Sequence, residues 1–168
     1  VQTCALPIYL VIINAVMIGW ADYARPNHRF VAFDKRTGKA VWISGTRPLP
    51  DDTTYSTPIP CVLGGQAAIV FGAGDGIVYA FQPRTGKELW KYPFSLRGIN
   101  VTPLVVGDTV FMAHSEENLG DNTMGAVAAI DGRTGTEKWK VKEIMIGKTA
   151  PLLIDGRLYL IEIGRAHV

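Results

Sequence analysis

Polar side chains that could do chemistry gather in one loop of the sequence, from His114 to Asp121. The stretch HSEENLGD offers an imidazole, carboxylates at Glu116, Glu117 and Asp121, and the amide of Asn118. Ca²⁺ prefers about six to eight oxygen ligands, so this loop could contribute to a calcium or cofactor site. The spacing is not that of an EF-hand, however, and acidic loops between strands commonly do no more than solvate a surface. A solvated loop is the favoured interpretation, and the residues kept as weak candidates for contacting a cofactor are Trp20, Arg97, His114, Glu116, Glu117 and Asn118.

Two further motifs have plainer structural explanations than catalytic ones. Asp51-Asp52 could be a carboxylate pair for acid–base work, but adjacent residues point different ways in an extended chain, which favours a turn after Pro50. GAGDG at 72–76 lacks the third glycine of a dinucleotide-binding fingerprint because Ile77 holds that place. It is expected to be a hairpin turn. No catalytic residue and no metal ligand is assigned from the sequence.

The composition favours an all-β domain and argues against nucleic acid as a partner. The 168 residues carry a formal net charge of +2, and no tract of Lys and Arg stands out. Gly, Pro, Val, Ile and Tyr are frequent, and no long stretch of helix formers occurs. The apolar run YLVIINAVMIGW at 9–20 is too short to span a bilayer. We expect it to form a buried strand, and we do not expect the chain to span a membrane.

Both ends of the chain resemble translated sequencing adapter more than natural protein. Residues 1–8 (VQTCALPI) and 162–168 (EIGRAHV) can be encoded by opposite strands of one short-read adapter. We therefore expect 9–161 to be the natural segment, cut from a longer gene. Cys61 is then the single native cysteine, and one cysteine can form neither an internal disulfide nor a zinc cluster.

One phrase occurs three times and predicts the architecture. AFDKRTGKAVW (32–42), AFQPRTGKELW (80–90) and AIDGRTGTEKW (129–139) share a first Ala, a Thr-Gly pair and a closing Trp, at a period of roughly 50 residues. The Asp at the third place should accept hydrogen bonds from the turn that follows, and Gln82 in the middle repeat should do so less well. The glycine can adopt positive φ, and the Trp can bury ~150–250 Å² against a neighbouring unit. The residues assigned to this structural motif are Asp34, Thr37, Gly38, Trp42, Thr85, Gly86, Trp90, Asp131, Thr134, Gly135 and Trp139.

Each period holds four short apolar runs separated by turn signals. In the best-preserved unit the expected strands are 102–106, 109–114, 125–131 and 136–141. Hairpin turns are expected in the two-residue gaps at Gly64-Gly65, Gly107-Asp108 and Asp155-Gly156. Four strands in about 40–50 residues predict a β-propeller of four-stranded antiparallel blades. The expected blades, complete or partial, are 9–44, 57–92, 102–142 and 150–161.

The repeated phrase resembles the tryptophan-docking motif of quinoprotein-type β-propellers, also called pyrroloquinoline-quinone (PQQ)-like repeats. The resemblance covers nearly all of 9–161 and implies about three blades of an eight-bladed ring, in a protein of the periplasm or the cell exterior. Catalytic members of that family hold PQQ and Ca²⁺ beside a vicinal Cys–Cys pair. Neither such a pair nor a C-x-x-C-H haem attachment occurs here.

Three functions remain open on these grounds. A non-catalytic platform, binding a protein partner or small ligand on the face formed by the long loops, is favoured. A PQQ- and Ca-dependent dehydrogenase of alcohols or sugars is the first alternative, and a sensor propeller fused to another domain is the second. We also expect the 168-residue chain to aggregate or fold poorly by itself, because a cut propeller exposes strand edges. The polar residues expected on the loop face are Asp22, Arg25, His28, Asp51, Asp52, Asp75, Arg97, His114, Glu116, Glu117, Asn118 and Asp121.

Overall fold

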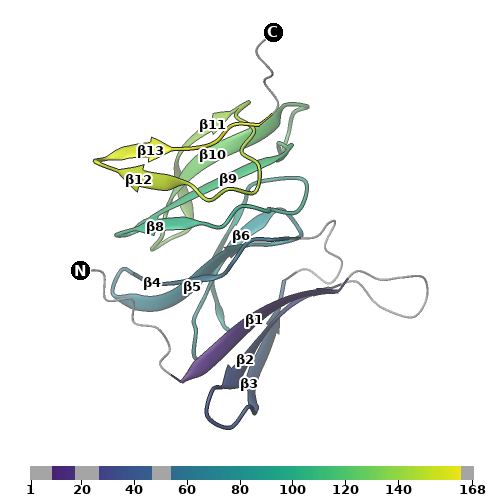
Figure 1. The fold of residues 1–168 in the computed structure, drawn as a ribbon, viewed down its shortest axis with the longest axis vertical. Coiled ribbons are helices and arrows are strands. Elements are labelled where there is room, and N and C mark those ends of the chain that lie inside the picture. Colours follow the sequence, from purple (N-terminus) through teal and green to yellow (C-terminus); the bar gives the residue numbers. More distant parts are fainter. Residues whose placement is uncertain (1–8, 18–26, 47–53, 164–168) are drawn as a thin grey trace, which may run out of the picture.

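The structure is a computed structural model that describes residues 9–17, 27–46 and 54–163, and every regular element in these ranges is a β-strand. The strands form antiparallel sheets that lie one upon another in chain order (Figure 1). The first sheet has three strands in the order β1-β2-β3, and the second and third sheets have four strands each. The prediction of an all-β propeller fold with four-stranded antiparallel blades is confirmed.

The strands follow the chain as meanders, so each strand pairs with the next one in sequence. The first sheet consists of β1 (Leu10–Met17), β2 (Asn27–Asp34) and β3 (Ala40–Gly45). The second consists of β4 (Ile59–Leu63), β5 (Gln66–Gly72), β6 (Ile77–Phe81) and β7 (Glu88–Pro93). The third consists of β8 (Leu104–Val106), β9 (Thr109–Glu117), β10 (Met124–Asp131) and β11 (Thr136–Lys142). A hairpin of β12 (Leu152–Ile154) and β13 (Arg157–Tyr159) follows.

Two of the expected two-residue turns have both residues at positive φ. These are Gly64-Gly65 (56° and 79°) and Asp155-Gly156 (48° and 73°). In the third, Gly107-Asp108, only the glycine has positive φ, at 55°. Turns of these kinds match the right-handed twist of the strands that they join, which explains why glycine and aspartate occupy them.

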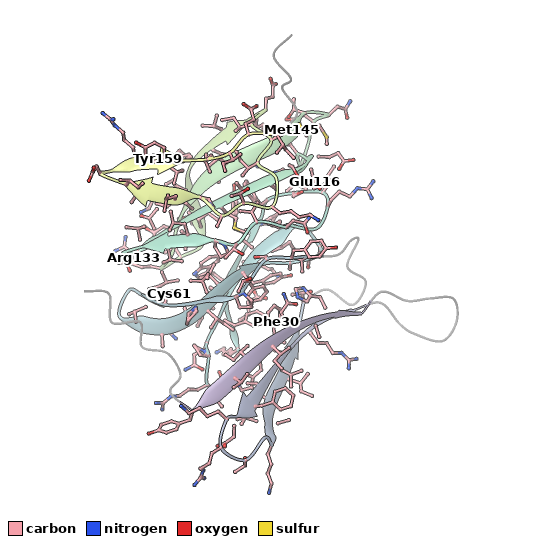
Figure 2. All side chains as sticks on the ribbon, viewed as in Figure 1. Phe30, Cys61, Glu116, Arg133, Met145 and Tyr159 are labelled. Carbon is pink, nitrogen blue, oxygen red and sulfur yellow. The ribbon has the colours of Figure 1, made fainter. Side chains whose placement is uncertain are left out.

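Two apolar layers hold the three sheets together. Between the first and second sheets, Phe30 packs on Phe71 with ring centroids 3.8 Å apart, and Tyr79 and Phe81 extend this aromatic cluster. Figure 2 shows Phe30 facing the second sheet. Between the second and third sheets lies the largest cluster, which includes Val70, Ala80, Trp90, Met112 and Ile130. Side chains alternate across a strand, so the second sheet, which lies between the other two, buries both of its faces.

The first sheet departs from the prediction of a fully buried strand at 9–20. Ile12 packs in the aromatic layer, but Val11 and Ile13 on the other face are 47% and 48% exposed. No described element covers that face of β1. The apolar run is typical of a strand that is buried on both faces. In the described residues, only the face that carries Ile12 is buried.

Candidate functional site

The connections between strands lie at two opposite ends of the stack. Figure 2 places Arg133, in a Thr-Gly turn, at one end, and Glu116 and Met145 at the other. We call the first the turn end and the second the loop end. The loop end carries the segments that join β5 to β6, β9 to β10, and each sheet to the next.

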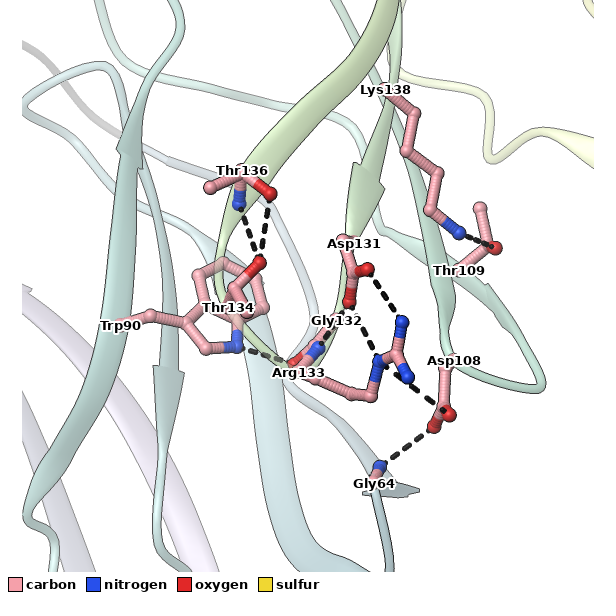
Figure 3. A network of polar contacts seen from close by, with 10 residues as sticks. All are labelled: Gly64, Trp90, Asp108, Thr109, Asp131, Gly132, Arg133, Thr134, Thr136 and Lys138. Carbon is pink, nitrogen blue, oxygen red and sulfur yellow. Dashed lines mark hydrogen bonds and ion pairs between the residues drawn. The ribbon is translucent and has the colours of Figure 1, made fainter.

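At the turn end, each Trp of the first two repeats contacts the turn of the following repeat. The indole nitrogen of Trp42 donates to the carbonyl of Pro83 at 2.9 Å, and that of Trp90 donates to the carbonyl of Gly132 at 2.6 Å (Figure 3). A Cβ added at Gly86 would lie 2.5 Å from the Trp42 ring. Glycine is therefore required here both by its positive φ of 68° and by contact with the indole.

The turns themselves are held by the side chain that precedes them. The Asp34 carboxylate accepts bonds from the amides of Arg36 and Thr37 and from the Thr37 hydroxyl. The Gln82 side-chain oxygen accepts bonds from the amide and the hydroxyl of Thr85, at 2.8 and 3.0 Å.

In the third repeat Asp131 accepts from both the amide and the guanidinium of Arg133, and Arg133 lowers the pKa of Asp131 to about 2. Arg133 also approaches Asp108, and Asp108 accepts a bond from the Gly64 amide at 2.7 Å (Figure 3). This network joins the second sheet to the third.

At the loop end, His114 is a core residue and not the loop residue that the sequence indicated. Strand β9 continues to Glu117, with His114 opposite Ala126, and this pairing turns the imidazole inward. His114 is 1% exposed, its ring meets Phe94 edge-on at 4.5 Å, and neither ring nitrogen has a hydrogen-bond partner among the described residues. Burial, aided by the charge of Lys140, lowers the pKa of His114 to about 4. The side chain is neutral at pH 7.

The polar groups that follow His114 are engaged in closing their own loop. Asn118 is 0% exposed, and its amide donates to the Thr123 hydroxyl and to the Gly125 carbonyl at 3.0 and 2.9 Å. Asp121 accepts from the Thr123 amide and pairs with Lys142, which holds the pKa of that carboxyl below its usual range. These contacts hold the loop in one shape.

A partly exposed group of the loop end lies around Glu117. Its carboxylate is 3.5 Å from the guanidinium nitrogen of Arg97, and its carbonyl accepts a bond from the Leu96 amide. Met124 lies directly opposite Glu117 in the β9–β10 ladder. Leu96 and Met124 are 47% and 37% exposed. We call Leu96, Arg97, Glu117 and Met124 the loop patch.

A second group lies where the sheets are joined, and sequence reasoning missed it. Each of its residues, Tyr55, Asn100 and Lys148, stands three places before a repeated proline. The Asn100 side chain accepts a bond from the Tyr55 amide at 3.2 Å, and the Lys148 ammonium lies 4.1 Å from the centre of the Tyr55 ring. The spacing of the prolines was the signal that could have brought these residues together.

Beneath this group, a polar network joins the first sheet to the second. The Asn14 side-chain oxygen accepts a bond from His28 Nε2 at 2.7 Å, and the Asn14 side-chain nitrogen donates to the Ser56 carbonyl. The Ser56 hydroxyl accepts from the Gly72 amide at 2.8 Å. His28 lies in β2 and is 1% exposed, so the prediction of a loop-face position was wrong for it too. An open pocket of about 280 Å³ lies beside the network, lined by Asn14 and residues 54–58.

The remaining candidates do not converge on one centre. Asp75 is buried and accepts a bond from the Tyr79 hydroxyl, and Cys61 is buried in the core. Within 9–17, 27–46 and 54–163 no group of three or more His, Cys, Asp or Glu side chains is arranged to hold a metal ion. The candidates that lie outside the described residues are Trp20, Asp22, Arg25, Asp51 and Asp52.

Four-stranded antiparallel sheets, stacked face to face and joined in chain order, define a β-propeller. The family model described as outer membrane protein assembly factor BamB matches residues 11–168. The chain belongs to this family of PQQ-like propeller repeats. No helix in the described part of the chain is long and apolar enough to cross a membrane.

Two curated relatives are quinone-dependent enzymes. A quinoprotein ethanol dehydrogenase of Pseudomonas aeruginosa is 32% identical over 144 residues, which is 77% of this chain and 22% of the relative. A 1-butanol dehydrogenase (quinone) of Thauera butanivorans is 30% identical over 141 residues, covering 75% of this chain and 21% of the relative. The chain thus spans about a fifth of the length of the curated relatives it matches. Among solved structures, BamB from Moraxella catarrhalis aligns with a TM-score of 0.52 at 19% identity, over 82% of this chain and 39% of that one.

Proposed function

We propose that the chain is part of a non-catalytic β-propeller that serves as a binding platform, located in the periplasm or outside the cell. The observation that carries the proposal is the state of the polar groups between His114 and Asp121. The imidazole is buried and neutral, Asn118 is buried, and Asp121 is paired with Lys142. Groups engaged in this way support a rigid loop and leave binding to the side chains that remain exposed.

The loop patch has the character of a protein-binding surface. Leu96 and Met124 are exposed apolar residues beside the Arg97–Glu117 ion pair, since the Leu96 amide is bonded to the Glu117 carbonyl and Met124 lies opposite Glu117 in the ladder. Both members of that pair are partly exposed, so the pair contributes at most about 1 kcal/mol to stability. A partner can therefore replace either member at little cost, while it buries the two apolar side chains. The expected partner is a protein segment with an apolar side chain flanked by charge.

Site-specific photo-crosslinking in the full-length protein tests this function. A photoreactive residue in place of Leu96 should capture a discrete envelope protein, and one in place of Lys87, which is exposed at the turn end, should capture roughly tenfold less. Adding Met124→Asp should weaken capture at position 96. Equal capture at both positions, or none at position 96, would contradict a platform that binds through the loop patch.

A quinone-dependent alcohol dehydrogenase is the second candidate, favoured by the identity to the ethanol and 1-butanol dehydrogenases. The full-length protein should be titrated with PQQ and Ca²⁺ while tryptophan fluorescence is followed, and then assayed for dye reduction with ethanol and 1-butanol. Saturable quenching together with turnover would favour a quinone-dependent dehydrogenase over a non-catalytic platform. A second domain in the complete reading frame would instead favour a sensor.

A further inference from the structure

Two neighbouring turns at the turn end carry cations that the repeated motif does not need. In the first repeat these are Lys35, Arg36 and Lys39, and in the second they are Arg84 and Lys87. All five residues are exposed, and no ion pair between described residues involves any of their side chains. We call these five residues the basic patch. It does not stand out as a tract in the sequence because it is assembled from two repeats.

Trp42 connects the two turns of the basic patch. Its indole donates to the Pro83 carbonyl and lies against Gly86 in the second turn, and Trp42 itself stands three places after Lys39 of the first turn. The turns lie at the ends of their strands, whereas neighbouring sheets pack against the faces of those strands. Further sheets of a propeller would therefore leave the basic patch open to solvent.

An arginine precedes the Thr-Gly pair in all three repeats, but ion pairs within the described residues neutralise only the third. Arg133 pairs with Asp131 at 3.0 Å and with Asp108 at 4.0 Å. Arg84 has no such partner among the described residues. The second turn therefore presents its positive charge to the solvent.

The second sheet has neutral residues at both places that are acidic in the third. Gln82 stands where Asp131 stands, and Gly65 in the β4–β5 hairpin stands where Asp108 stands in the β8–β9 hairpin. The Gln82 side-chain oxygen accepts bonds from the amide and hydroxyl of Thr85, so the turn keeps its support without a negative charge. All four strands of the second sheet are described, so this lack of carboxylates does not depend on where the sequence begins or ends.

We propose that the basic patch draws the protein to the surface of a membrane rich in anionic phospholipids, with the turn end against the headgroups. Unpaired Lys and Arg side chains have no contact that fixes them, so they match a dense, mobile array of phosphates better than the fixed carboxylates of a folded protein. A bilayer surface offers such an array to all five cations at once. The loop end lies opposite the turn end, so a protein bound in this way presents the loop patch away from the membrane (Figure 2).

The test is partitioning of the full-length protein onto large vesicles of two compositions. One set consists of phosphatidylcholine alone, and the other contains an equal part of phosphatidylglycerol. The measured quantity is the ratio of the two partition coefficients, from which any attraction common to both vesicles cancels. The ratio should be well above one at about 0.1 M salt and should approach one at about 1 M, because the Debye length falls from about 10 Å to about 3 Å.

Two double variants remove the same charge from opposite ends of the protein. Arg84→Gln with Lys87→Gln should lower the ratio roughly 30-fold, since each cation near an anionic surface contributes roughly fivefold. The matched control is Lys142→Gln with Lys148→Gln, which removes two exposed cations from the loop end. The control should keep the ratio within about twofold of the wild-type value, because screening weakens charges that face away from the bilayer.

Gln82→Asp separates attraction to the membrane from folding. The new carboxylate should pair with Arg84 as Asp131 pairs with Arg133, so the ratio should fall about fivefold or more although the turn is held at least as firmly. A wild-type ratio near one would overturn the proposal and point to an acidic protein as the partner of the basic patch. Equal losses in the two double variants, or a wild-type ratio in Gln82→Asp, would also overturn it. None of these results changes the expected crosslinking at the loop patch, so the two proposals fail separately.

Discussion

Replacing Gly86 by Ala tests the physical role of the repeated glycine. Gly86 has φ of 68°, and a Cβ there would lie 2.5 Å from the Cε3 atom of Trp42, whose indole is also bonded to the Pro83 carbonyl. Gly65 has φ of 79° and open space at the same position. Gly65→Ala therefore carries the cost of the backbone conformation alone, while Gly86→Ala adds the contact with the indole.

The expected difference follows from these contacts. An alanine at positive φ costs about 1–2 kcal/mol, and this cost is common to both variants. Moving the Trp42 indole away from the new methyl adds about 1–3 kcal/mol of overpacking, and loss of its hydrogen bond adds about 1 kcal/mol. Gly86→Ala should thus be less stable than Gly65→Ala by about 2–4 kcal/mol.

The assay is urea unfolding of the full-length protein, followed by far-UV circular dichroism. The same two glycine variants are then measured with Trp42→Leu added, which removes the indole. There the difference between them should fall below about 1 kcal/mol. Equal stability of the two variants in the presence of Trp42, or a difference that persists without it, would refute the argument that the glycine serves the indole.

Three further predictions use the same unfolding measurement. The pKa of His114 is about 4 in the folded chain and about 6.5 in the unfolded chain. As the pH falls from about 6.5 to about 4, the unfolded chain therefore takes up a proton that the folded chain excludes, and the free energy of unfolding decreases. His114→Leu should reduce this slope by about 1.4 kcal/mol per pH unit, and an unchanged slope would mean that the imidazole is not buried. Gln82→Asp should raise the free energy of unfolding by about 0.5 kcal/mol, since the carboxylate accepts charge-assisted bonds from the turn, and a loss of stability would contradict this. The Tyr92 hydroxyl donates to Glu137, so Tyr92→Phe should cost about 1 kcal/mol, whereas Tyr159→Phe, at an exposed hydroxyl, should cost almost nothing.

Local signals were enough to predict the strands of the best-preserved unit. Observed strands β8 to β11 match the expected ranges, except that β8 begins at Leu104 and β9 continues to Glu117. The sequence predicts that this strand ends at residue 114, so it places His114 at the start of a loop. Because β9 continues to Glu117, His114 lies within the strand. The residues SEE look like a polar loop in isolation, but ladder pairing with Met124 and Ala126 extends the strand through them.

The chemistry of the loop end was less predictable than its strands. Polar residue types marked the loops, yet the sequence does not tell whether a carboxylate faces solvent, a lysine or a turn amide. Asp121 illustrates this, because it lies in the loop between β9 and β10 while its partner Lys142 comes from strand β11. The cluster of Tyr55, Asn100 and Lys148 likewise requires segments from three periods to meet in space.

The sequence by itself determined the repeat, the turn chemistry and the class of fold, because these depend on residues close together in the chain: an Asp or Gln, a Thr-Gly pair and a Trp within eleven positions. Only the tertiary structure decided which turn each Trp contacts. Trp42, Trp90 and Trp139 occupy the same place in the same phrase, but only the first two meet a following turn within the described chain. Those two contacts join residues 41 and 42 positions apart, so no single repeat contains either of them.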